Sequence, residues 1–355
     1  MNNAKRNISR SKHILIITPG FPKDEDDFNC IPPLQEFLIS FGSRFPDSKF
    51  TIISLHYPYH KKKYYWKGIP IFPMAGKNIR IKKPLLWYNT IGQAMKINEE
   101  NKIDIIHSLW LGECAMLGNI LSNKFDCEHI CTLMGQDVKP TNRYLKRLIN
   151  KKIKIIALSE NQSNQFYTLT KRKVDEIIQW GIDDQLINNL ERDIDLLGVG
   201  SFIPLKNYSL LIKVVEENAK KNPALTCKLI GAGSESSKLK TMAKEKGLTN
   251  NIEFTGLLNR KKIFNLMQRS KILVHPSKFE GSGYVFAEAL VNGMNIVSFN
   301  IGYAQKHPKW FIAKDEQDFI NITQNLLSTE LDFTPVNLFP MSESVARYTS
   351  IYGVI

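Results

Sequence analysis

The sequence predicts an α/β protein made of two halves, each built on a parallel sheet with helices on both faces. Short apolar runs alternate with longer amphipathic stretches along almost the whole chain, a pattern typical of strand–helix–strand units. The alternation stops in the polar stretch 183–193 and then starts again. A length of 355 residues also suggests roughly two domains, each large enough to bury a core.

In the first half, the apolar run 13–18 ends at the breaker Pro19-Gly20 and predicts the first strand. The stretch 33–45 then has the spacing of an amphipathic helix. Further apolar runs predict four more strands, with a basic helix between the last two. These strands cover residues 50–55, 103–109, 129–134 and 153–159, and the basic helix covers 142–152.

The second half opens with the apolar run 195–202 and repeats the alternation. Strands are predicted over 225–231, 252–256, 271–276 and 295–299, and helices over 207–221, 236–247, 260–270 and 284–293. A last helix follows the Pro-containing connection 336–341. The predicted domains are therefore residues 1–183 and 194–340, followed by a C-terminal helix in 341–355.

Composition narrows the class of protein. The chain has 48 Lys and Arg against 34 Asp and Glu, a formal net charge of +14, which favours an anionic partner such as a nucleotide, a membrane surface or a nucleic acid. The five cysteines form no C-x-x-C pair, so neither a disulfide framework nor a zinc cluster is indicated. The apolar run near the N-terminus is too short for a secretion signal. We therefore expect a cytoplasmic protein, with any membrane contact peripheral and on the inner face.

The most informative loop is HPSKFEGSGYVFAEALVNG, residues 275–293. Gly281 and Gly283 would let a ligand approach the backbone, and amides at the helix start suit an anion. Glu280 precedes these glycines and Glu288 lies on the second helical turn, so the pair could accept hydrogen bonds from sugar or ribose hydroxyls. A glycine turn with one surface glutamate explains the same sequence pattern, and both interpretations remain open here.

Two other loops leave strand ends in the same half. In GVGSFIPLKN (198–207), glycines at a strand end precede Lys206, which suits phosphate, although a lone lysine is usually solvated. In LIGAGSES (229–236), Gly231 and Gly233 begin a dinucleotide fingerprint, but Ser236 occupies the third glycine position. A tight strand-to-helix turn explains this second loop equally well.

Taken together, these loops resemble glycosyltransferase family four in order and approximate spacing. The resemblance is clearest over 195–299. Weaker matches in the first half are ITPGFP (17–22), DIIHS (104–108), MGQDV (134–138), ALSE (157–160) and WGID (180–183). The resemblance implies the GT-B fold, with two Rossmann-like domains facing across a cleft and a C-terminal helix that crosses back to the first domain.

The resemblance also implies roles for individual residues. Glu280 would hold donor-sugar hydroxyls, Glu288 would bind the ribose, and Lys206 would neutralise phosphate as the leaving group departs. Gly20 would face the donor across the cleft. The remaining residues expected at the donor are Gly200, Ser201, Gly231, Gly233, Gly281, Ser282, Gly283, Tyr284 and Val285, the last three through their backbone amides.

This chain departs from the family pattern at three places. Ser201 replaces the usual arginine, so one phosphate contact is missing or comes from elsewhere. Met134 replaces a frequent histidine, which leaves Asp137 as a catalytic candidate and His107 as another. The acidic stretch DEDDFN (24–29) replaces a glycine pair.

Two basic stretches lie in the first half. Residues 59–83 carry eight Lys or Arg and 138–159 carry seven, and neither has an acidic residue. Tyr64, Tyr65 and Trp66 interrupt the first stretch. Both are either solvated faces or surfaces for anionic lipid headgroups, with the aromatic side chains at the membrane interface. No nucleic-acid-binding module accompanies the charge, so we expect no nucleic-acid partner.

The resemblance therefore implies a retaining hexosyltransferase that moves a sugar from a UDP- or GDP-linked donor to a saccharide or lipid-linked acceptor in cell-surface polysaccharide or lipopolysaccharide synthesis. The resemblance implies no metal and no cofactor beyond the nucleotide-sugar substrate. An NAD(P)-dependent oxidoreductase and a non-catalytic nucleotide-sugar- or membrane-binding homologue remain as alternatives. The D-x-D pairs that a metal-dependent transferase would need, at 24–26 and 193–195, are interpreted as surface charges.

Overall fold

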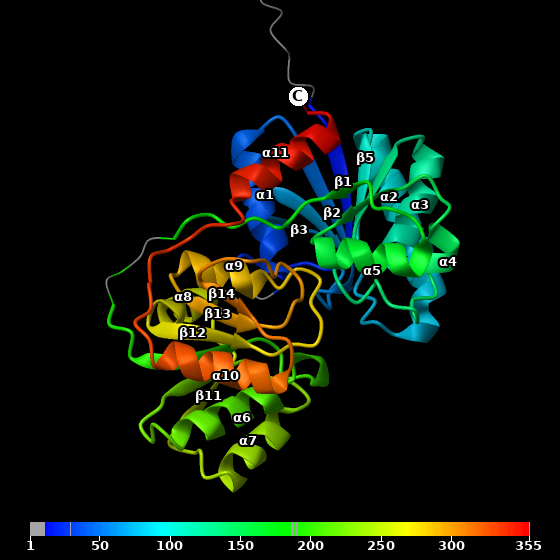
Figure 1. The fold of residues 1–355 in the computed structure, drawn as a ribbon. Helices are drawn as coiled ribbons and strands as arrows, with labels where there is room; N and C mark the ends of the chain where they lie inside the picture. The colour runs from blue at the N-terminus through cyan, green and yellow to red at the C-terminus, as the bar shows by residue number, and fades with distance from the viewer. Residues whose placement is uncertain (1–10, 29, 186–187, 189, 355) are drawn as a thin grey trace, which may run out of the picture. The chain divides into compact units, whose positions relative to one another are not determined.

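The computed structural model of the protein describes residues 11–28, 30–185, 188 and 190–354 (Figure 1). The chain forms two compact units. The first contains the described residues up to Gly181 and those from Met341 onward, and the second is Ile182–Pro340. Each unit has its own sheet and its own core, in agreement with the predicted α/β class.

The first unit contains an eight-stranded sheet in the order β3-β4-β2-β1-β5-β6-β7-β8. All of its strand pairs are parallel except β3 with β4. Its strands are β1 (His13–Gly20), β2 (Lys49–Tyr57), β3 (Tyr64–Trp66), β4 (Ile69–Pro73), β5 (Ile105–Leu109), β6 (Glu128–Thr132), β7 (Lys154–Ala157) and β8 (Glu176–Ile177). Its helices before Gly181 are η1 (Arg80–Lys82), α1 (Pro32–Arg44), α2 (Lys83–Glu100), α3 (Glu113–Phe125), α4 (Leu145–Leu148) and α5 (Glu160–Thr170).

The five strands predicted for this half are present as β1, β2, β5, β6 and β7. The sequence did not predict the β3–β4 hairpin or helices α2, α3 and α5. The basic helix predicted over 142–152 is largely wrong, because only α4 forms there. The Asn142 side chain donates to the carbonyls of Leu111 and Asp137 and accepts from the amide of Tyr144, and such contacts favour a turn over a helix.

The C-terminal helix α11 (Met341–Tyr352) packs back onto the first unit, as predicted. It lies against α1, with the rings of Phe37 and Tyr348 4.8 Å apart. At the sheet, His107 Nδ1 lies 2.7 Å from the Tyr352 hydroxyl, and Thr132 Oγ1 lies 2.9 Å from the Tyr348 hydroxyl. Aromatic packing and buried hydrogen bonds thus join the end of the chain to β5 and β6.

The second unit contains a six-stranded parallel sheet in the order β11-β10-β9-β12-β13-β14. Helices α6, α7 and α10 share one apolar core on one face of this sheet, and α8 and α9 lie on the other side (Figure 1). Its strands are β9 (Ile194–Val199), β10 (Cys227–Ile230), β11 (Ile252–Gly256), β12 (Ser270–His275), β13 (Asn295–Ser298) and β14 (Trp310–Ile312). Its helices are η2 (Pro204–Lys206), α6 (Tyr208–Ala219), α7 (Ser236–Glu245), α8 (Arg260–Gln268), α9 (Tyr284–Val291) and α10 (Glu316–Leu327).

All the predicted strands and helices of the second unit are present. Among the described residues of this unit, the sequence missed β14, α10 and the short helix η2. Because the strands are parallel, the loops after β9, β10, β11, β12 and β13 all leave the same edge of the sheet. This carboxyl edge is where the sequence places the informative loops.

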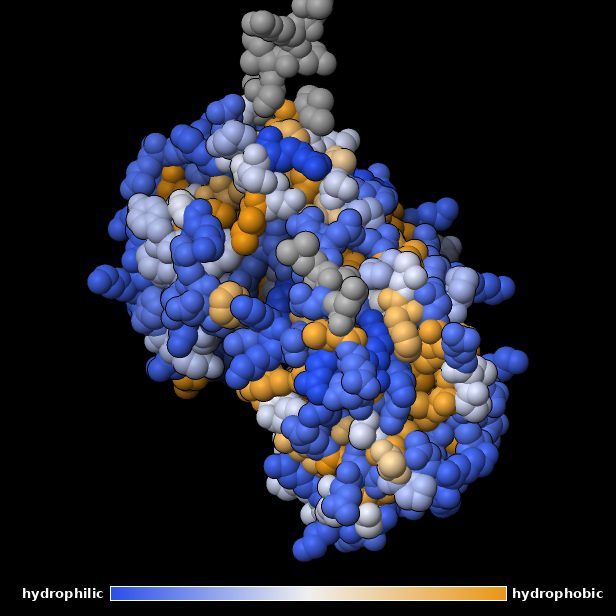
Figure 2. Space-filling view, turned by 90° about the vertical axis from the view of Figure 1, so that its left-hand side faces the viewer, coloured by the Kyte–Doolittle hydropathy of each residue, from blue (hydrophilic) through white to orange (hydrophobic). Residues whose placement is uncertain are grey.

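On the face drawn in Figure 2, hydrophilic side chains predominate and hydrophobic ones gather in smaller patches. Among the residues that the structure describes, no helix combines the length and the apolar character needed to cross a bilayer.

Candidate functional site

Three charged or polar side chains meet at the carboxyl edge of the second sheet. His275 ends β12, Glu280 lies in the loop that follows, and Lys206 ends η2. His275 Nε2 lies 2.8 Å from Glu280 Oε1, and the Lys206 ammonium forms an ion pair with the same oxygen. The His275 ring is buried, and the side chains of Glu280 and Lys206 are largely enclosed.

The electrostatics of this cluster keep Glu280 ionised. Burial alone would raise the pKa of Glu280, but the hydrogen bond with His275 and the positive charge nearby outweigh it and lower the pKa to about 2. Burial lowers the pKa of His275, so we take the ring as a neutral donor to the carboxylate. Glu280 is therefore an acceptor of hydrogen bonds at neutral pH, as a ligand for hydroxyl groups must be.

The two loops that carry Lys206 and Glu280 are held together by their backbones. The amide of Lys278 donates to the carbonyl of Leu205 over 2.9 Å, and the Ser277 hydroxyl donates to the same carbonyl over 3.3 Å. Because β9 and β12 are neighbours in the sheet, η2 and the loop after β12 lie side by side. The pairing of Lys206 with Glu280 thus follows from the strand order.

The glycine turn after Glu280 sets the start of α9. Gly283 has φ +70°, and a Cβ added there would lie 2.5 Å from the Phe286 ring, so this position requires glycine. The Ser282 carbonyl accepts from the Tyr303 amide, 2.8 Å away, which joins the turn to the loop after β13. The amides of Tyr284 and Val285 belong to the first turn of α9, at the positive end of its dipole.

Glu288, the second predicted carboxylate, has a different partner from Glu280. Its Oε1 lies 3.2 Å from a terminal nitrogen of Arg260, the first residue of α8. The Arg260 guanidinium also lies over the rings of Phe264, at 4.7 Å, and Tyr284, at 5.6 Å. The two carboxylates of the motif therefore belong to two separate ion pairs at the same edge of the sheet.

Sequence reasoning did not identify Arg260. It lies directly after the helix cap Asn259, whose side chain accepts from the amide of Lys262. The available signal was an arginine at the first position of a helix that follows a strand, on the edge where the other loops gather. Its pairing with Glu288 depends on tertiary structure and could not be read from the local pattern.

The glycines at 231 and 233 bring two loops into close backbone contact. A Cβ on Gly231 would lie 1.9 Å from the Gly200 carbonyl oxygen, and one on Gly233 would lie 2.3 Å from that of Phe202. The Phe202 amide donates to the carbonyl of Ala232 over 2.9 Å. Packing between the loops after β9 and β10 accounts for both glycines, and their predicted contact with the donor stays a prediction.

In the part of the chain that the structure describes, the Tyr208 hydroxyl and His275 Nδ1 are buried at this edge without a hydrogen-bond partner. A Cβ on Gly200 would lie 2.9 Å from the Tyr208 hydroxyl, and burial together with the charge of Glu280 raises the Tyr208 pKa. Neighbouring Ser201 is exposed. Buried polar groups usually have a partner, so these atoms are candidates for contact with a bound polar molecule.

In the first unit, Asp137 is buried and its carboxylate accepts from three backbone amides. These belong to Leu111 at 2.8 Å, Gly135 at 2.7 Å and Met134 at 3.1 Å. Burial raises its pKa, although the amides act in the opposite direction. The contacts hold the turn after β6 to the loop after β5, which favours a structural role over the predicted catalytic one.

His107 and Gly20 also lie in the first unit. His107 is buried between Tyr352 and Thr132, and burial lowers its pKa to about 3, so it serves as a neutral structural link. Gly20 ends β1, where an added Cβ would lie 3.4 Å from Tyr57 and 3.5 Å from the sulfur of Cys30. Its predicted contact with the donor stays a prediction.

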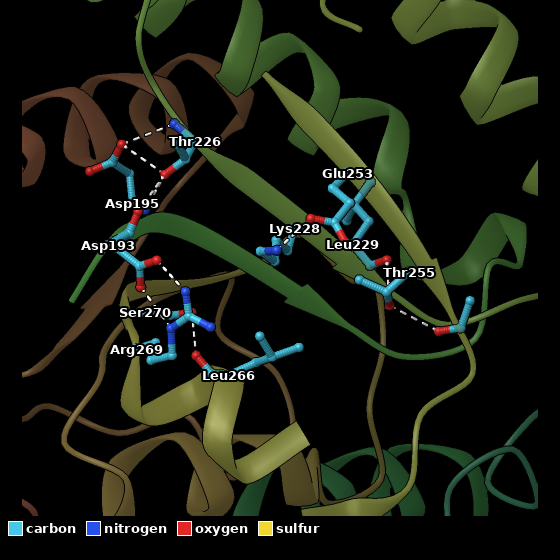
Figure 3. A network of polar contacts seen from close by, with 11 residues as sticks. Asp193, Asp195, Thr226, Lys228, Leu229, Glu253, Thr255, Leu266, Arg269 and Ser270 are labelled. Atoms are coloured by element: carbon cyan, nitrogen blue, oxygen red, sulfur yellow. Dashed lines mark hydrogen bonds and ion pairs between the residues drawn. The ribbon is translucent and has the colours of Figure 1, made fainter. Parts of the chain in front are cut away.

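The D-x-D pair at 193–195 belongs to a structural network at the amino ends of the second sheet (Figure 3). Asp193 forms an ion pair with Arg269. Asp195 accepts from the Thr226 amide at 3.0 Å and pairs with Lys271 at 2.7 Å. These carboxylates lie on the sheet edge opposite to Glu280. In the other pair, Asp24 Oδ1 accepts from the backbone amide of Asp26, which closes a local turn.

The two basic stretches differ in structure. In 138–159, the apolar side chains Leu145 and Leu148 are buried, and the cations between them face water. In 59–83, Trp66 is buried as well, whereas Tyr65 and most of the lysines are exposed. Over the described part of the chain, no group of three or more His, Cys, Asp or Glu side chains is arranged to hold a metal ion.

Comparison with known proteins identifies the class. Residues 183–307 match the family of glycosyl transferases group 1. The chain is 28% identical over 277 residues to an uncharacterized glycosyltransferase of Methanocaldococcus jannaschii, covering 75% of this chain and 71% of that protein. It is 27% identical over 128 residues to the poly(ribitol-phosphate) α-N-acetylglucosaminyltransferase of Staphylococcus aureus, covering 36% and 25% of the two chains.

Among solved structures, HepE of Anabaena, in complex with UDP and glucose, superimposes with a TM-score of 0.69 at 17% identity, over 97% of this chain and 96% of that one. The chain is therefore similar to the glycosyl transferases of group 1, and it has the GT-B fold. This confirms the predicted fold and the predicted class of enzyme, and it removes the oxidoreductase alternative. Membership of family four within the group stays a prediction.

Proposed function

We propose that the protein is a retaining hexosyltransferase whose second unit holds a nucleotide-sugar through the Lys206–Glu280–His275 cluster and the start of α9. The observation that carries this proposal is the shared oxygen of Glu280, which contacts a cation on one side and a neutral imidazole on the other. An ionised acceptor of this kind would suit sugar hydroxyls, and the positive charge beside it would suit phosphate.

In the reaction, the bond between the anomeric carbon and the phosphate oxygen breaks, and its electron pair leaves with the nucleoside diphosphate. A new bond forms between that carbon and an acceptor hydroxyl oxygen on the same face of the sugar, and the hydroxyl proton goes to a leaving phosphate oxygen. Lys206 and the amides of Tyr284 and Val285 would stabilise the growing negative charge. These groups supply the charge that a metal ion supplies in other transferases, so the proposal includes metal-independent transfer.

Glu280 would orient the sugar hydroxyls, and Glu288 with Arg260 would contact the nucleoside. Arg260 also provides a cation at this edge of the sheet where Ser201 does not. We propose a UDP- or GDP-linked hexose as the donor. The UDP and glucose in the HepE complex and the N-acetylglucosaminyl transfer in the name of the S. aureus relative support this choice.

We propose a saccharide or lipid-linked saccharide as the acceptor, in the assembly of a cell-surface polysaccharide or lipopolysaccharide at the inner face of the cell membrane. The polymeric acceptor in the name of the S. aureus relative supports the first part of this proposal. The net charge of +14 on the chain would favour binding beside an anionic membrane surface.

The test begins with thermal unfolding in the presence of UDP, GDP and their common sugar conjugates. A ligand at one hundred times its dissociation constant should stabilise the fold by about 2.7 kcal/mol. With the donor so identified, nucleoside diphosphate release and glycan transfer are measured for Glu280→Gln, with Glu253→Gln as a control. Glu253 pairs with Lys228 at the surface of β10 and β11 (Figure 3).

We expect Glu280→Gln to lower turnover by roughly a hundredfold or more, with the fold intact and the control unaffected. Unchanged turnover in Glu280→Gln would contradict the proposal. Donor binding without hydrolysis or transfer, across a panel of acceptors, would favour the non-catalytic alternative instead.

A further inference from the structure

An exposed apolar stripe lies at the start of α2 in the first unit. Ile81 is 87% exposed, Leu85 60% and Tyr88 76%. Because η1 runs directly into α2, these residues follow at about helical spacing and lie along one face. Ile79 precedes them and is also exposed. Large apolar side chains gathered in this way are unusual on a surface that meets only water.

Cations surround this stripe, and no acidic residue lies near it in the sequence. Lys77, Arg80 and Lys82 are exposed beside the apolar side chains. The chain has no Asp or Glu between Asp47 and Glu99. The stripe is therefore both apolar and positively charged, the combination by which a helix binds the surface of an anionic bilayer.

The base of the stripe is held rigidly by a partly buried carboxylate. Glu113, at the start of α3, pairs with Lys83 at 2.7 Å and with His56 at 3.3 Å, and accepts from the indole of Trp87. Burial alone would raise the pKa of Glu113, but these hydrogen bonds and the charge of Lys83 lower it to about 2. Glu113 is thus neutralised by its own partners, Lys83 and His56.

The backbone that precedes the stripe is also held by His56, the partner of Glu113. Ala75, Lys77 and Asn78 have left-handed φ values of 51°, 52° and 55°. The Asn78 amide donates to His56 Nδ1 over 3.2 Å, and the Gly76 amide donates to the Leu55 carbonyl over 2.8 Å. Non-glycine residues in this region cost conformational energy, and such strain persists where the surrounding contacts fix the loop.

The basic stretch 138–159 does not share these features. Leu145 and Leu148 on α4 are buried, so the cations Lys146 and Arg147 lie on a hydrophilic face. Of the three aromatic residues expected at a membrane interface, Trp66 is buried, the Tyr64 hydroxyl donates to the Pro22 carbonyl, and only Tyr65 is exposed. The apolar stripe over residues 79–88 exposes more large apolar side chains than this aromatic run does.

We propose that residues 79–88 form a docking surface for an anionic lipid bilayer, in which Ile79, Ile81, Leu85 and Tyr88 enter the interface while Arg80 and Lys82 bind headgroup phosphates. Charge favours lipid over a second copy of the chain. A symmetric dimer through this surface would bring two positive patches face to face, since a two-fold interface pairs each patch with itself. The proposal stands on the first unit alone and does not depend on transfer chemistry in the second.

The experiment is co-sedimentation of the full chain with vesicles of phosphatidylcholine, alone or mixed with phosphatidylglycerol. One variant removes the apolar contact (Ile81→Ser with Leu85→Ser) and a second removes two cations (Arg80→Gln with Lys82→Gln). The matched control removes two cations from α4 (Lys146→Gln with Arg147→Gln). All six side chains are exposed, so the fold should persist, and thermal unfolding checks this.

We expect binding only to the mixed vesicles, weakened by salt. The Arg80 and Lys82 variant should bind about thirtyfold more weakly, since each cation near an anionic surface contributes about 1 kcal/mol. The apolar variant should also lose binding, and the α4 control should bind normally.

Equal losses in the control and in the Arg80 and Lys82 variant would mean that net charge alone drives binding, and would overturn the proposal. Normal binding by the apolar variant would overturn it too. Sedimentation velocity provides the last check. The proposal would also be overturned if the wild type did not bind vesicles but formed a dimer, and if the Ile81 and Leu85 substitutions dissociated that dimer. The surface would then be a self-association interface.

Discussion

His275 and Glu280 share a hydrogen bond of 2.8 Å in which a buried imidazole supports a carboxylate that also contacts Lys206. His275 ends β12 and Glu280 lies five residues later, so the strand end and the loop after it fix the carboxylate together. The imidazole thus holds the acid in position, and the cation lies beside the same carboxylate oxygen. His275 acts through Glu280 and is a positioning residue.

The first prediction tests whether His275 supports Glu280 through its hydrogen bond or only through the volume of its side chain. His275→Gln keeps an N–H donor, whereas His275→Leu leaves Glu280 without this partner. A hydrogen bond to a charged group contributes about 1.5–3 kcal/mol, so the Leu variant should lose roughly ten- to a hundredfold in turnover. The Gln variant should recover a large part of that loss. Steady-state kinetics with the identified donor measure both, and equal losses in the two variants would mean that packing alone explains His275.

The second prediction concerns stability at acid pH. The folded pKa of Glu280 is about 2, below its ordinary value of 4.5. A carboxyl group with a lowered pKa contributes stability that is fully present above the unfolded pKa and is lost as the pH falls toward the folded pKa. The wild type should therefore lose more stability than Glu280→Gln between about pH 5 and about pH 3. Urea unfolding at these two values measures the difference, and parallel losses would contradict the lowered pKa.

The third prediction tests the ion pair of Arg260 with Glu288. If the pair binds the nucleoside as a unit, Arg260→Ala and Glu288→Gln should each weaken nucleotide binding, and the double variant should be little worse than either. Calorimetric titration with the nucleoside diphosphate measures the cycle. Asp193→Asn with Arg269→Gln is the control, because that pair lies at the opposite edge of the sheet (Figure 3). Full additivity of the two losses would show that Arg260 and Glu288 act independently.

Apolar runs bounded by glycine or proline made most of the second unit predictable. β11 occupies the predicted residues 252–256, and the helix expected from Tyr284 begins there. Local sequence patterns gave a wrong prediction where side chains form hydrogen bonds with the backbone, as Asn142 does in the predicted basic helix. They also missed the β3–β4 hairpin, in which Lys67, Pro70 and Pro73 interrupt the alternation of a strand.

The candidate site was predictable only in part, because its contacts join distant segments. The loop that carries Glu280 is recognisable from its letters, and so is the strand end before Lys206. Their contact depends on β9 and β12 being neighbours although β10 and β11 lie between them in the sequence. The same limit explains why the ion pair with Arg260 was missed and why Asp137, conspicuous in the sequence, proved to be a buried anchor.

The last prediction tests whether Gly231 and Gly233 are needed for packing before any ligand is present. An alanine Cβ at 231 would meet the Gly200 carbonyl oxygen at 1.9 Å, and one at 233 would meet that of Phe202 at 2.3 Å. Gly231 also has φ +148°, which side chains rarely adopt. Each alanine variant should be destabilised by about 1–3 kcal/mol or more, since the two backbones must move apart.

Gly42→Ala in α1 is the control, because nothing lies within 4 Å of its added Cβ and alanine favours a helix by about 0.5–1 kcal/mol. Chemical unfolding without nucleotide is the measurement. Variants as stable as the wild type but unable to bind nucleotide would assign these glycines to the donor rather than to the loop contact.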